Sequence, residues 1–339
     1  MAVCNSIPGL DRRLGVLLAG AWLGLATPAQ ALTIVPTFDV SITGNGNAAQ
    51  IEGAINTAIS TIEGLFGNPV TIPVSFTYTN AGSGNLMSTY QFYYQTTYAG
   101  YVAALTANSL AHPANTTLAS AILHLPQGND ADGSRQLAIA GGLYAQLGFG
   151  GAPQAIVNIN SVQNFTFAGA VSNISFDAVG GLEHELNEVL GGGGAGSTLN
   201  SQAACAGNPG DFFCNKIGPL DPYRYSAAGA PSFDASGAVT SYFSVDGGVT
   251  GIVGFNQNSG GDYADFTPSC GTGGGSGQLI QNAFNCTGQY ESFTSASPEY
   301  RMLQSIGWTA AATDVPEPGS MLLMAAGLAG LAGARRRLG

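Results

Sequence analysis

Residues 176–191 restrict the fold more than any other segment, because their apolar positions repeat with the period of an α-helix. Either Ser175 or Asp177 can cap the first turn, and Gly191 suits the left-handed conformation that follows a helix end. The pattern predicts one amphipathic helix, whose apolar face must pack against another element. The repeating apolar residues are Val179, Leu182, Leu186, Val189 and Leu190.

The polar side of this predicted helix carries His184, Glu185 and Glu188. His184 and Glu188 are four residues apart, so both side chains can reach one metal ion from successive turns. Glu185 lies about 100° around the helix axis from His184. There a carboxylate can act as a general base on a water beside the metal without being a ligand itself.

A solvated charged face is the alternative for this segment, with Glu183, Glu185 and Glu188 serving no chemistry. We favour metal binding because the helix is otherwise apolar and rich in glycine. Acidic side chains buried there without a cation would be costly.

The chain before this helix is predicted to mix strands and helices. Alternating apolar residues predict a strand at 70–78 with one buried face, and Pro73 assigns it an edge or an early position. Shorter strands are predicted at 38–42 and 156–159. Spacings of three and four residues predict helices at 51–66, 98–109 and 137–147, the last weakened by two glycines.

Beyond residue 191 the chain becomes rich in Gly, Asn and Ser, with few periodic runs. The break at residues 191–194 is therefore the predicted subdomain boundary. The pattern as a whole predicts an α+β fold.

The N-terminal end has the three parts of a secretory signal peptide. Two arginines precede an apolar run at residues 14–26, and the small-residue sequence Ala29-Gln30-Ala31 follows. The apolar run is shorter than the roughly 20 residues that a membrane span needs. We therefore expect residues 1–31 to be a signal peptide that is cleaved after Ala31.

The C-terminal end has a different three-part pattern. Residues 315–320 read Val-Pro-Glu-Pro-Gly-Ser, apolar residues occupy 321–334, and three arginines occupy 335–337. This tail resembles the PEP-CTERM sorting signal of Gram-negative bacteria, which an exosortase-type membrane protease processes. The resemblance implies transient membrane association and a final place at the outer cell surface or in the extracellular matrix. A permanent C-terminal anchor is the alternative.

Charge and cysteine content narrow the class of protein. The formal net charge is −11, which excludes a nucleic-acid binder because such proteins concentrate Lys and Arg. Once Cys4 leaves with the signal peptide, an even number of cysteines remains for an oxidising compartment. Three pairings are possible, and we favour the sequence-local one, Cys205–Cys214 with Cys270–Cys286. A cysteine metal site is the alternative, but it lacks any Cys-x-x-Cys pair.

Residues 184–188 read His-Glu-Leu-Asn-Glu, which resembles the H-E-x-x-H motif of the zincin metalloproteases with Glu188 in place of the second His. Gly191 matches the glycine of the longer metzincin pattern H-E-x-x-H-x-x-G-x-x-H, whereas its last His position is Gly194. Zinc accepts carboxylate oxygens, so one His with two carboxylates is a possible donor set. Such a site is harder than a three-His site, and another divalent ion is also possible.

A wider resemblance is to a group of PEP-CTERM-tailed metalloproteases that use H-E-x-x-E. It implies a zincin-like α+β fold, with an N-terminal subdomain at 32–191 that contains a mixed sheet and ends in the active-site helix. A loop-rich C-terminal subdomain would follow at 192–312, before the sorting tail at 313–339. The resembling blocks are the helix and residues 220–226, 242–248, 255–266 and 302–308.

A third metal ligand must come from beyond the glycine turn. Asp221 is the first choice, because it lies in the next compact polar-aromatic block. Its alternative is a structural Asp paired with Arg224. Asp262 and Asp265, in a Gly-rich block, are second choices, with turn-forming acids or a calcium site as their alternative.

Three further residues are weaker candidates for the site. Tyr225 can donate its hydroxyl to a developing oxyanion, or it can be a core tyrosine. His112 and His124 are expected to be structural or exposed.

The expected function is that of an exported metal-dependent endopeptidase, with Zn²⁺ or another divalent cation and Glu185 as general base. Its partners would be a protein or peptide substrate and the exosortase-type sorting machinery. The alternative is a non-catalytic envelope or extracellular-matrix protein on a zincin-like scaffold.

Overall fold

A four-stranded mixed sheet underlies the candidate site. The computed structural model describes residues 31–126, 136–202, 205, 207–234, 238–268, 270, 276–291 and 293–311. Almost all of the predicted signal peptide and sorting tail lies outside these residues. The sheet order is β1-β2-β6-β3, with β3 at one edge. These strands are β1 (Thr33–Phe38), β2 (Thr71–Thr79), β6 (Ala155–Asn160) and β3 (Met87–Gln91).

Strand β2 shows how the sequence pattern produces the sheet. Its alternate residues Ile72, Val74 and Phe76 are fully buried, as expected of a strand with one face in the core. It pairs in parallel with both β1 and β6, so it is not an edge strand. Pro73 is tolerated because strand β2 begins to pair with β6 only at the next residue, Val74. This matches the early position in the strand that the proline predicted.

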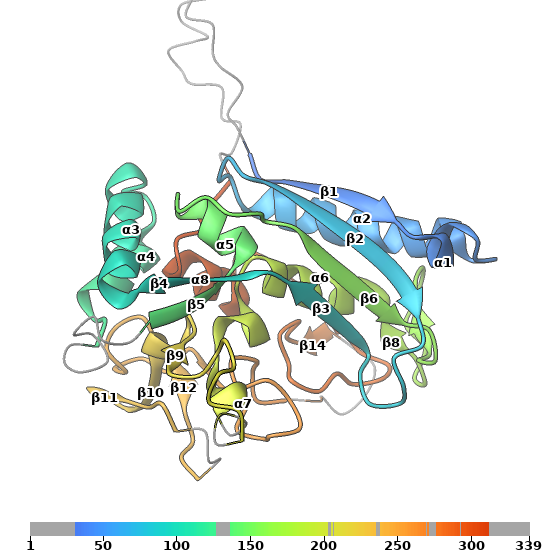
Figure 1. Cartoon of the computed structure of the whole chain (residues 1–339). Coiled ribbons are helices and arrows are strands. Elements are labelled where there is room, and N and C mark those ends of the chain that lie inside the picture. The colour runs from blue at the N-terminus through green and yellow to red at the C-terminus, as the bar shows by residue number, and fades with distance from the viewer. Residues whose placement is uncertain are drawn as a thin grey trace, which may run out of the picture.

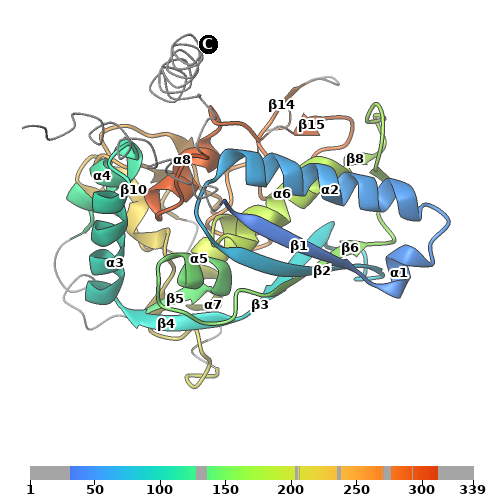
Figure 2. The same cartoon turned by 90° about the horizontal axis from the view of Figure 1, so that it is seen from above.

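Two long helices, α2 (Ala48–Leu65) and α6 (Ala178–Val189), cover one face of this sheet, as Figure 2 shows. Both helices bury the apolar stripe that their spacing predicted. Burying each such side chain contributes roughly 1.5–3 kcal/mol. Strand β3 lies against α6 (Figure 1), so an open sheet edge borders the helix that carries the candidate ligands.

A second sheet, in the order β4-β5-β9, extends the fold beyond β3. Its strands are β4 (Tyr93–Thr97), β5 (Gln136–Ala140) and β9 (Lys216–Ile217). Helices α3 (Tyr98–Ala111) and α4 (Thr116–Leu123) follow β4, as Figure 1 shows, and α5 (Gly141–Gln146) follows β5.

The predictions for this half of the chain are mostly confirmed. The helices at 51–66 and 98–109 and the strands at 70–78 and 156–159 correspond to α2, α3, β2 and β6. The strand predicted at 38–42 is wrong, because Asp39 accepts a hydrogen bond from the Ser41 N–H (2.8 Å) and caps the short helix α1 (Val40–Thr43).

The helix predicted at 137–147 is half wrong. Residues up to Ala140 form β5, and the helix begins only at Gly141. A short buried apolar run is compatible with either element, so its spacing alone does not decide between them.

Short elements dominate the chain after α6. They include the helices η1 (Gly193–Gly196), α7 (Leu199–Gln202), η3 (Asp221–Tyr223) and α8 (Pro298–Ser305). The short strands after α6 are β10 (Arg224–Ala227), β11 (Ala230–Pro231), β12 (Tyr242–Phe243), β13 (Val253–Gly254), β14 (Ser276–Gln278) and β15 (Tyr290–Glu291), while β7 (Phe165–Thr166) and β8 (Phe176–Asp177) come just before α6.

Covalent and polar links tie these short elements together. Disulfides join Cys205 to Cys214 and Cys270 to Cys286, which confirms the predicted pairing. The indole N–H of Trp308 donates to the carbonyl of Leu190 (2.9 Å), so the chain after α8 is fastened to the end of α6. The described residues form a mixed α+β structure, and none of their helices combines the length and apolarity required to cross a bilayer.

Candidate metal centre

Helix α6 begins and ends where the sequence predicted. The carboxylate of Asp177 accepts a hydrogen bond from the Val179 N–H (3.1 Å) and caps the first turn. Gly191, just past the end, has a φ of 85°, which a residue with a side chain rarely adopts. Near the middle, a Cβ atom at Gly181 would lie 3.1 Å from Met87 Cε. The glycine therefore allows close contact between α6 and β3.

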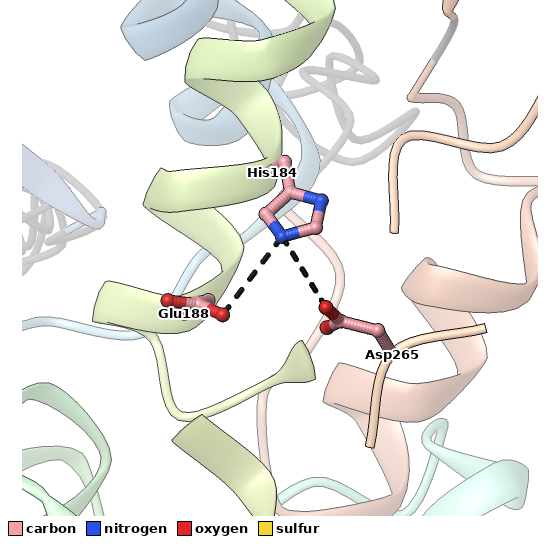
Figure 3. A group of neighbouring side chains, drawn as sticks. All are labelled: His184, Glu188 and Asp265. Atoms are coloured by element: carbon pink, nitrogen blue, oxygen red, sulfur yellow. Dashed lines mark ion pairs between the residues drawn. The ribbon is translucent and has the colours of Figure 1, made fainter. Parts of the chain in front are cut away.

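The imidazole of His184 is held with one nitrogen directed at two carboxylates. Its Nδ1 lies 2.7 Å from the carbonyl oxygen of Ile280; a carbonyl only accepts, so Nδ1 donates this hydrogen bond and Nε2 is the nitrogen left to bind an ion. Nε2 lies 3.8 Å from Glu188 Oε1 and 3.7 Å from Asp265 Oδ2; Figure 3 shows it facing both carboxylates. Two atoms that each lie about 2.1 Å from one ion are at most about 4.2 Å apart. Both distances therefore fit a shared ion.

Asp265 reaches this cluster from a loop that is fastened on both sides. Its backbone carbonyl accepts the Asn256 N–H (2.8 Å), and the Asn256 side chain donates to the carbonyl of Asp262 (3.0 Å). The buried guanidinium of Arg224 donates to the carbonyl of Tyr263 and to Ser241 Oγ. The loop is thus positioned by contacts outside the cluster.

Glu185 lines the same cavity as the cluster. Its Oε2 accepts a hydrogen bond of 2.7 Å from the hydroxyl of Thr89 on β3. Burial raises the pKa of Glu185 to about 7, against the opposing effects of His184 and Thr89. A carboxylate with a pKa near neutrality suits proton transfer.

A cavity of about 600 Å³ opens over these residues. The residues around it include four acids, Glu185, Glu188, Asp262 and Asp265, and among them is no Lys or Arg. Burial raises the pKa of Glu188 and Asp265 well above the ordinary range, and repulsion among the acids adds to it. A divalent cation would remove this repulsion, so the donor set fits a metal ion.

Gly194 leaves room for this arrangement. A Cβ atom there would lie 2.5 Å from Glu188 Oε1 and 2.6 Å from Asp262 Oδ2, closer than such atoms approach one another. The position that holds the last His of the metzincin pattern is here kept free for carboxylate oxygens.

The structure does not bring Asp221 to His184 and Glu188. Asp221 is fully buried elsewhere. Its Oδ1 accepts from Ser197 Oγ (2.6 Å), and its Oδ2 accepts from the N–H groups of Gly218 (2.7 Å) and Thr198 (3.3 Å). Both oxygens are engaged in holding the chain after α6. Among the described residues, the group of acids and histidines with metal-binding geometry is His184, Glu188 and Asp265.

The remaining candidates also lie away from the cluster. The hydroxyl of Tyr225 donates to the carbonyl of His124 (2.8 Å), and Tyr225 does not line the cavity. His124 is exposed at the end of α4, and His112 is half-buried at the end of α3.

Sequence reasoning missed two residues that touch the site. Thr89 holds Glu185, and Gln281 contacts both His184 and Asp265. Neither lies in a motif, and both reach the site only through the tertiary fold.

Comparison with known families concerns the C-terminal tail. Residues 314–337 match the family model of the PEP-CTERM protein-sorting motif. The chain carries a PEP-CTERM sorting signal. This motif implies export, sorting to the cell surface and recognition by exosortase machinery. No curated protein and no solved structure matches the chain.

Proposed function

We propose that this PEP-CTERM-tailed chain is an exported metal-dependent endopeptidase on a zincin-like scaffold. The observation that carries the proposal is the convergence of His184, Glu188 and Asp265 beside Glu185 in one cavity. Asp265 takes the ligand role that Asp221 was expected to have. Zn²⁺ is the proposed ion, and the two carboxylates also suit a harder divalent cation.

The chemistry follows from the positions of these side chains. When bound, a divalent cation supplies Lewis-acid polarisation of the scissile carbonyl and of the attacking water. Glu185 takes the proton of that water and delivers it to the leaving amine. Because Thr89 donates to Oε2, Oε1 is the atom that carries the proton in this proposal. Tyr225 has no part in it.

An extended peptide is the substrate that the cavity suits best. Strand β3 pairs with β6 on one side and is the last strand of its sheet. Residues 83–89, which include the start of β3, line the cavity. A peptide in extended conformation would add to this edge and place one of its carbonyls over the cluster.

The cellular setting follows from the sorting signal. The proposed enzyme would be attached to the membrane only transiently, through the PEP-CTERM tail. It would then act at the outer surface or in the extracellular matrix of a Gram-negative cell.

Casein hydrolysis by the purified, zinc-loaded protein tests the proposal. Glu185→Gln should abolish turnover while the bound metal remains. Glu183→Gln is the matched control, because Glu183 is on the same helix and does not line the cavity. If Glu185→Gln hydrolyses casein at the rate of the unaltered protein, the assigned base is wrong. A protein that binds no metal and is insensitive to chelators would favour the non-catalytic envelope or matrix protein.

A further inference from the structure

The carboxamide of Gln281 lies in the middle of the proposed metal ligands. Its Nε2 is 2.7 Å from Asp265 Oδ1 and 3.1 Å from His184 Nε2. Its Oε1 accepts a hydrogen bond of 2.7 Å from the side chain of Asn187. Gln281 is fully buried, and a Cβ atom at Gly193 would collide with its carboxamide. The side chain is therefore packed into place beside the cluster.

In this arrangement the NH₂ group of Gln281 contacts two of the proposed metal ligands. It offers one hydrogen to the lone pair of His184 and the other to Asp265, two of the groups that would bind an ion. A metal ion between these ligands would face the hydrogens of Nε2, which is unfavourable. A half-turn of the carboxamide exchanges its nitrogen and oxygen at almost no change of shape.

After that half-turn, Oε1 would occupy the place of Nε2, about 3.1 Å from His184 Nε2. This is within the roughly 4.2 Å that two ligands of one ion can span. Side-chain amide oxygens are ordinary ligands of divalent cations.

Asn187 is placed so that it can turn together with Gln281. It is fully buried on α6, one residue before Glu188. Its Nδ2 donates to Gln281, while its Oδ1 has no hydrogen-bond partner in the described part of the chain. In the described part of the chain, the contact with Gln281 is therefore what fixes the orientation of the Asn187 carboxamide. If Asn187 turns together with Gln281, Oδ1 accepts from the Gln281 NH₂ group, so the Asn187–Gln281 pair keeps its hydrogen bond.

We infer that Gln281 is a further protein ligand of the metal through Oε1, and that Asn187 is the positioning residue that rotates with it. This inference rests on the proposed metal centre. It adds a neutral oxygen to one imidazole and two carboxylates, so the metal-bound cluster keeps its charge while its coordination becomes more nearly complete.

Zinc affinity, measured by competition with a chromophoric chelator, tests the inference on the purified protein. Gln281→Leu should weaken Zn²⁺ binding at least about tenfold, the loss typical when a metal site loses a supporting group. Gln281→Glu keeps an oxygen and should bind Zn²⁺ more tightly than the unaltered protein. Gln163→Leu is the matched control, because Gln163 lines the same cavity and its side chain donates to the backbone carbonyls of Ser83 and Asn85 rather than to the cluster.

The visible spectrum of the Co²⁺-loaded protein gives a second readout that loss of packing alone would not move. Gln281→Leu should shift the d–d bands, and Gln163→Leu should leave them in place. If Gln281→Leu binds Zn²⁺ as tightly as the unaltered protein, the carboxamide is not a ligand and the inference is overturned. If it binds Zn²⁺ more tightly, the carboxamide competes with the metal, which also overturns the inference. If Gln281→Leu does not fold, failure of Gln281→Glu to tighten binding overturns it.

Failure of the metal centre and failure of the Gln281 assignment are distinguishable. If His184→Ala binds Zn²⁺ as the unaltered protein does, the metal centre itself is misplaced. If His184→Ala loses Zn²⁺ and Gln281→Leu does not, the centre stands without Gln281.

Discussion

Thr89 on the edge strand β3 donates a hydrogen bond of 2.7 Å to Oε2 of Glu185 on α6. This contact joins the strand proposed to bind the substrate to the residue proposed to move the proton. Gln91, two residues further along β3, donates to the carbonyl of Glu188 (2.9 Å). Two side-chain hydrogen bonds thus fix the edge strand β3 relative to α6, the helix that carries the proposed ligands.

Replacing Thr89 with Val should shift the pH dependence of hydrolysis. The Thr89 hydroxyl lowers the pKa of Glu185 because it stabilises the charged carboxylate. Without it the pKa rises, and the acid limb of kcat/KM against pH should move to higher pH. Thr89→Ser keeps the hydroxyl and should leave the limb near its original position. If the acid limb lies at the same pH in the unaltered protein and in both variants, Glu185 is not the group whose ionisation produces it.

Asp265→Asn and Asp221→Asn should have opposite consequences. Asp265→Asn removes a proposed ligand and relieves repulsion among buried acids, so Zn²⁺ affinity should fall at least about tenfold while the metal-free protein loses no stability. Asp221→Asn breaks buried hydrogen bonds to Ser197 and Gly218. It should cost about 1–3 kcal/mol of unfolding free energy and leave Zn²⁺ stoichiometry intact. Denaturant titration with and without Zn²⁺ measures the stability of each variant and its stabilisation by the metal. If Asp221→Asn loses Zn²⁺ binding and Asp265→Asn does not, Asp221 is the ligand after all.

Gly194→Ala should disable the site through crowding alone. The added methyl group would press against the oxygens of Glu188 and Asp262 and displace a proposed ligand. Zn²⁺ affinity should fall at least about tenfold. Gly53→Ala is the control, because a Cβ atom at Gly53 meets nothing within 4 Å and alanine favours the interior of α2 by roughly 0.5–1 kcal/mol. Equal Zn²⁺ affinity in both variants would contradict the assigned ligand positions.

Glu299→Gln should change how stability depends on pH. Burial raises the pKa of Glu299 from 4.5 to about 7, so between these values the folded state binds more protons than the unfolded state. Stability contributed by this group therefore falls as pH rises through that window and is constant above it. Glutamine does not ionise and lacks this loss. The variant should therefore be the more stable protein above about pH 7, by an amount on the order of a few kcal/mol.

Thermal unfolding of both proteins in the presence of a chelator measures this effect. The difference in midpoint between Glu299→Gln and the unaltered protein should grow from about pH 5 to about pH 8. An equal difference at both values would mean that Glu299 is charged in the folded protein.

The local sequence pattern was sufficient to predict the part of the candidate site that lies on helix α6. The spacing of His184 and Glu188, the cap at Asp177 and the glycine at 191 are properties of neighbouring residues, and the structure has the helix where they predicted it. The same holds for β2 and α2, whose periodicity is strong.

The third proposed ligand could not be chosen from the local sequence pattern. Asp221 and Asp265 both follow the helix in aperiodic segments, and only tertiary contacts decide which carboxylate meets His184. Asp221 is close in sequence, but backbone N–H groups occupy it. Gln281 carries no charge and belongs to no motif, so nothing in its sequence context marked it. Short elements such as α1 and β5 were missed because a cap or a pairing partner outweighs a brief apolar pattern.

Anomalous scattering at the zinc edge, from crystals of the zinc-loaded protein, is the most direct test of the central claim. We predict one strong peak about 2.0–2.2 Å from His184 Nε2 and from an oxygen of both Glu188 and Asp265. No peak at His184, or a peak coordinated by other residues, would contradict the proposed metal centre.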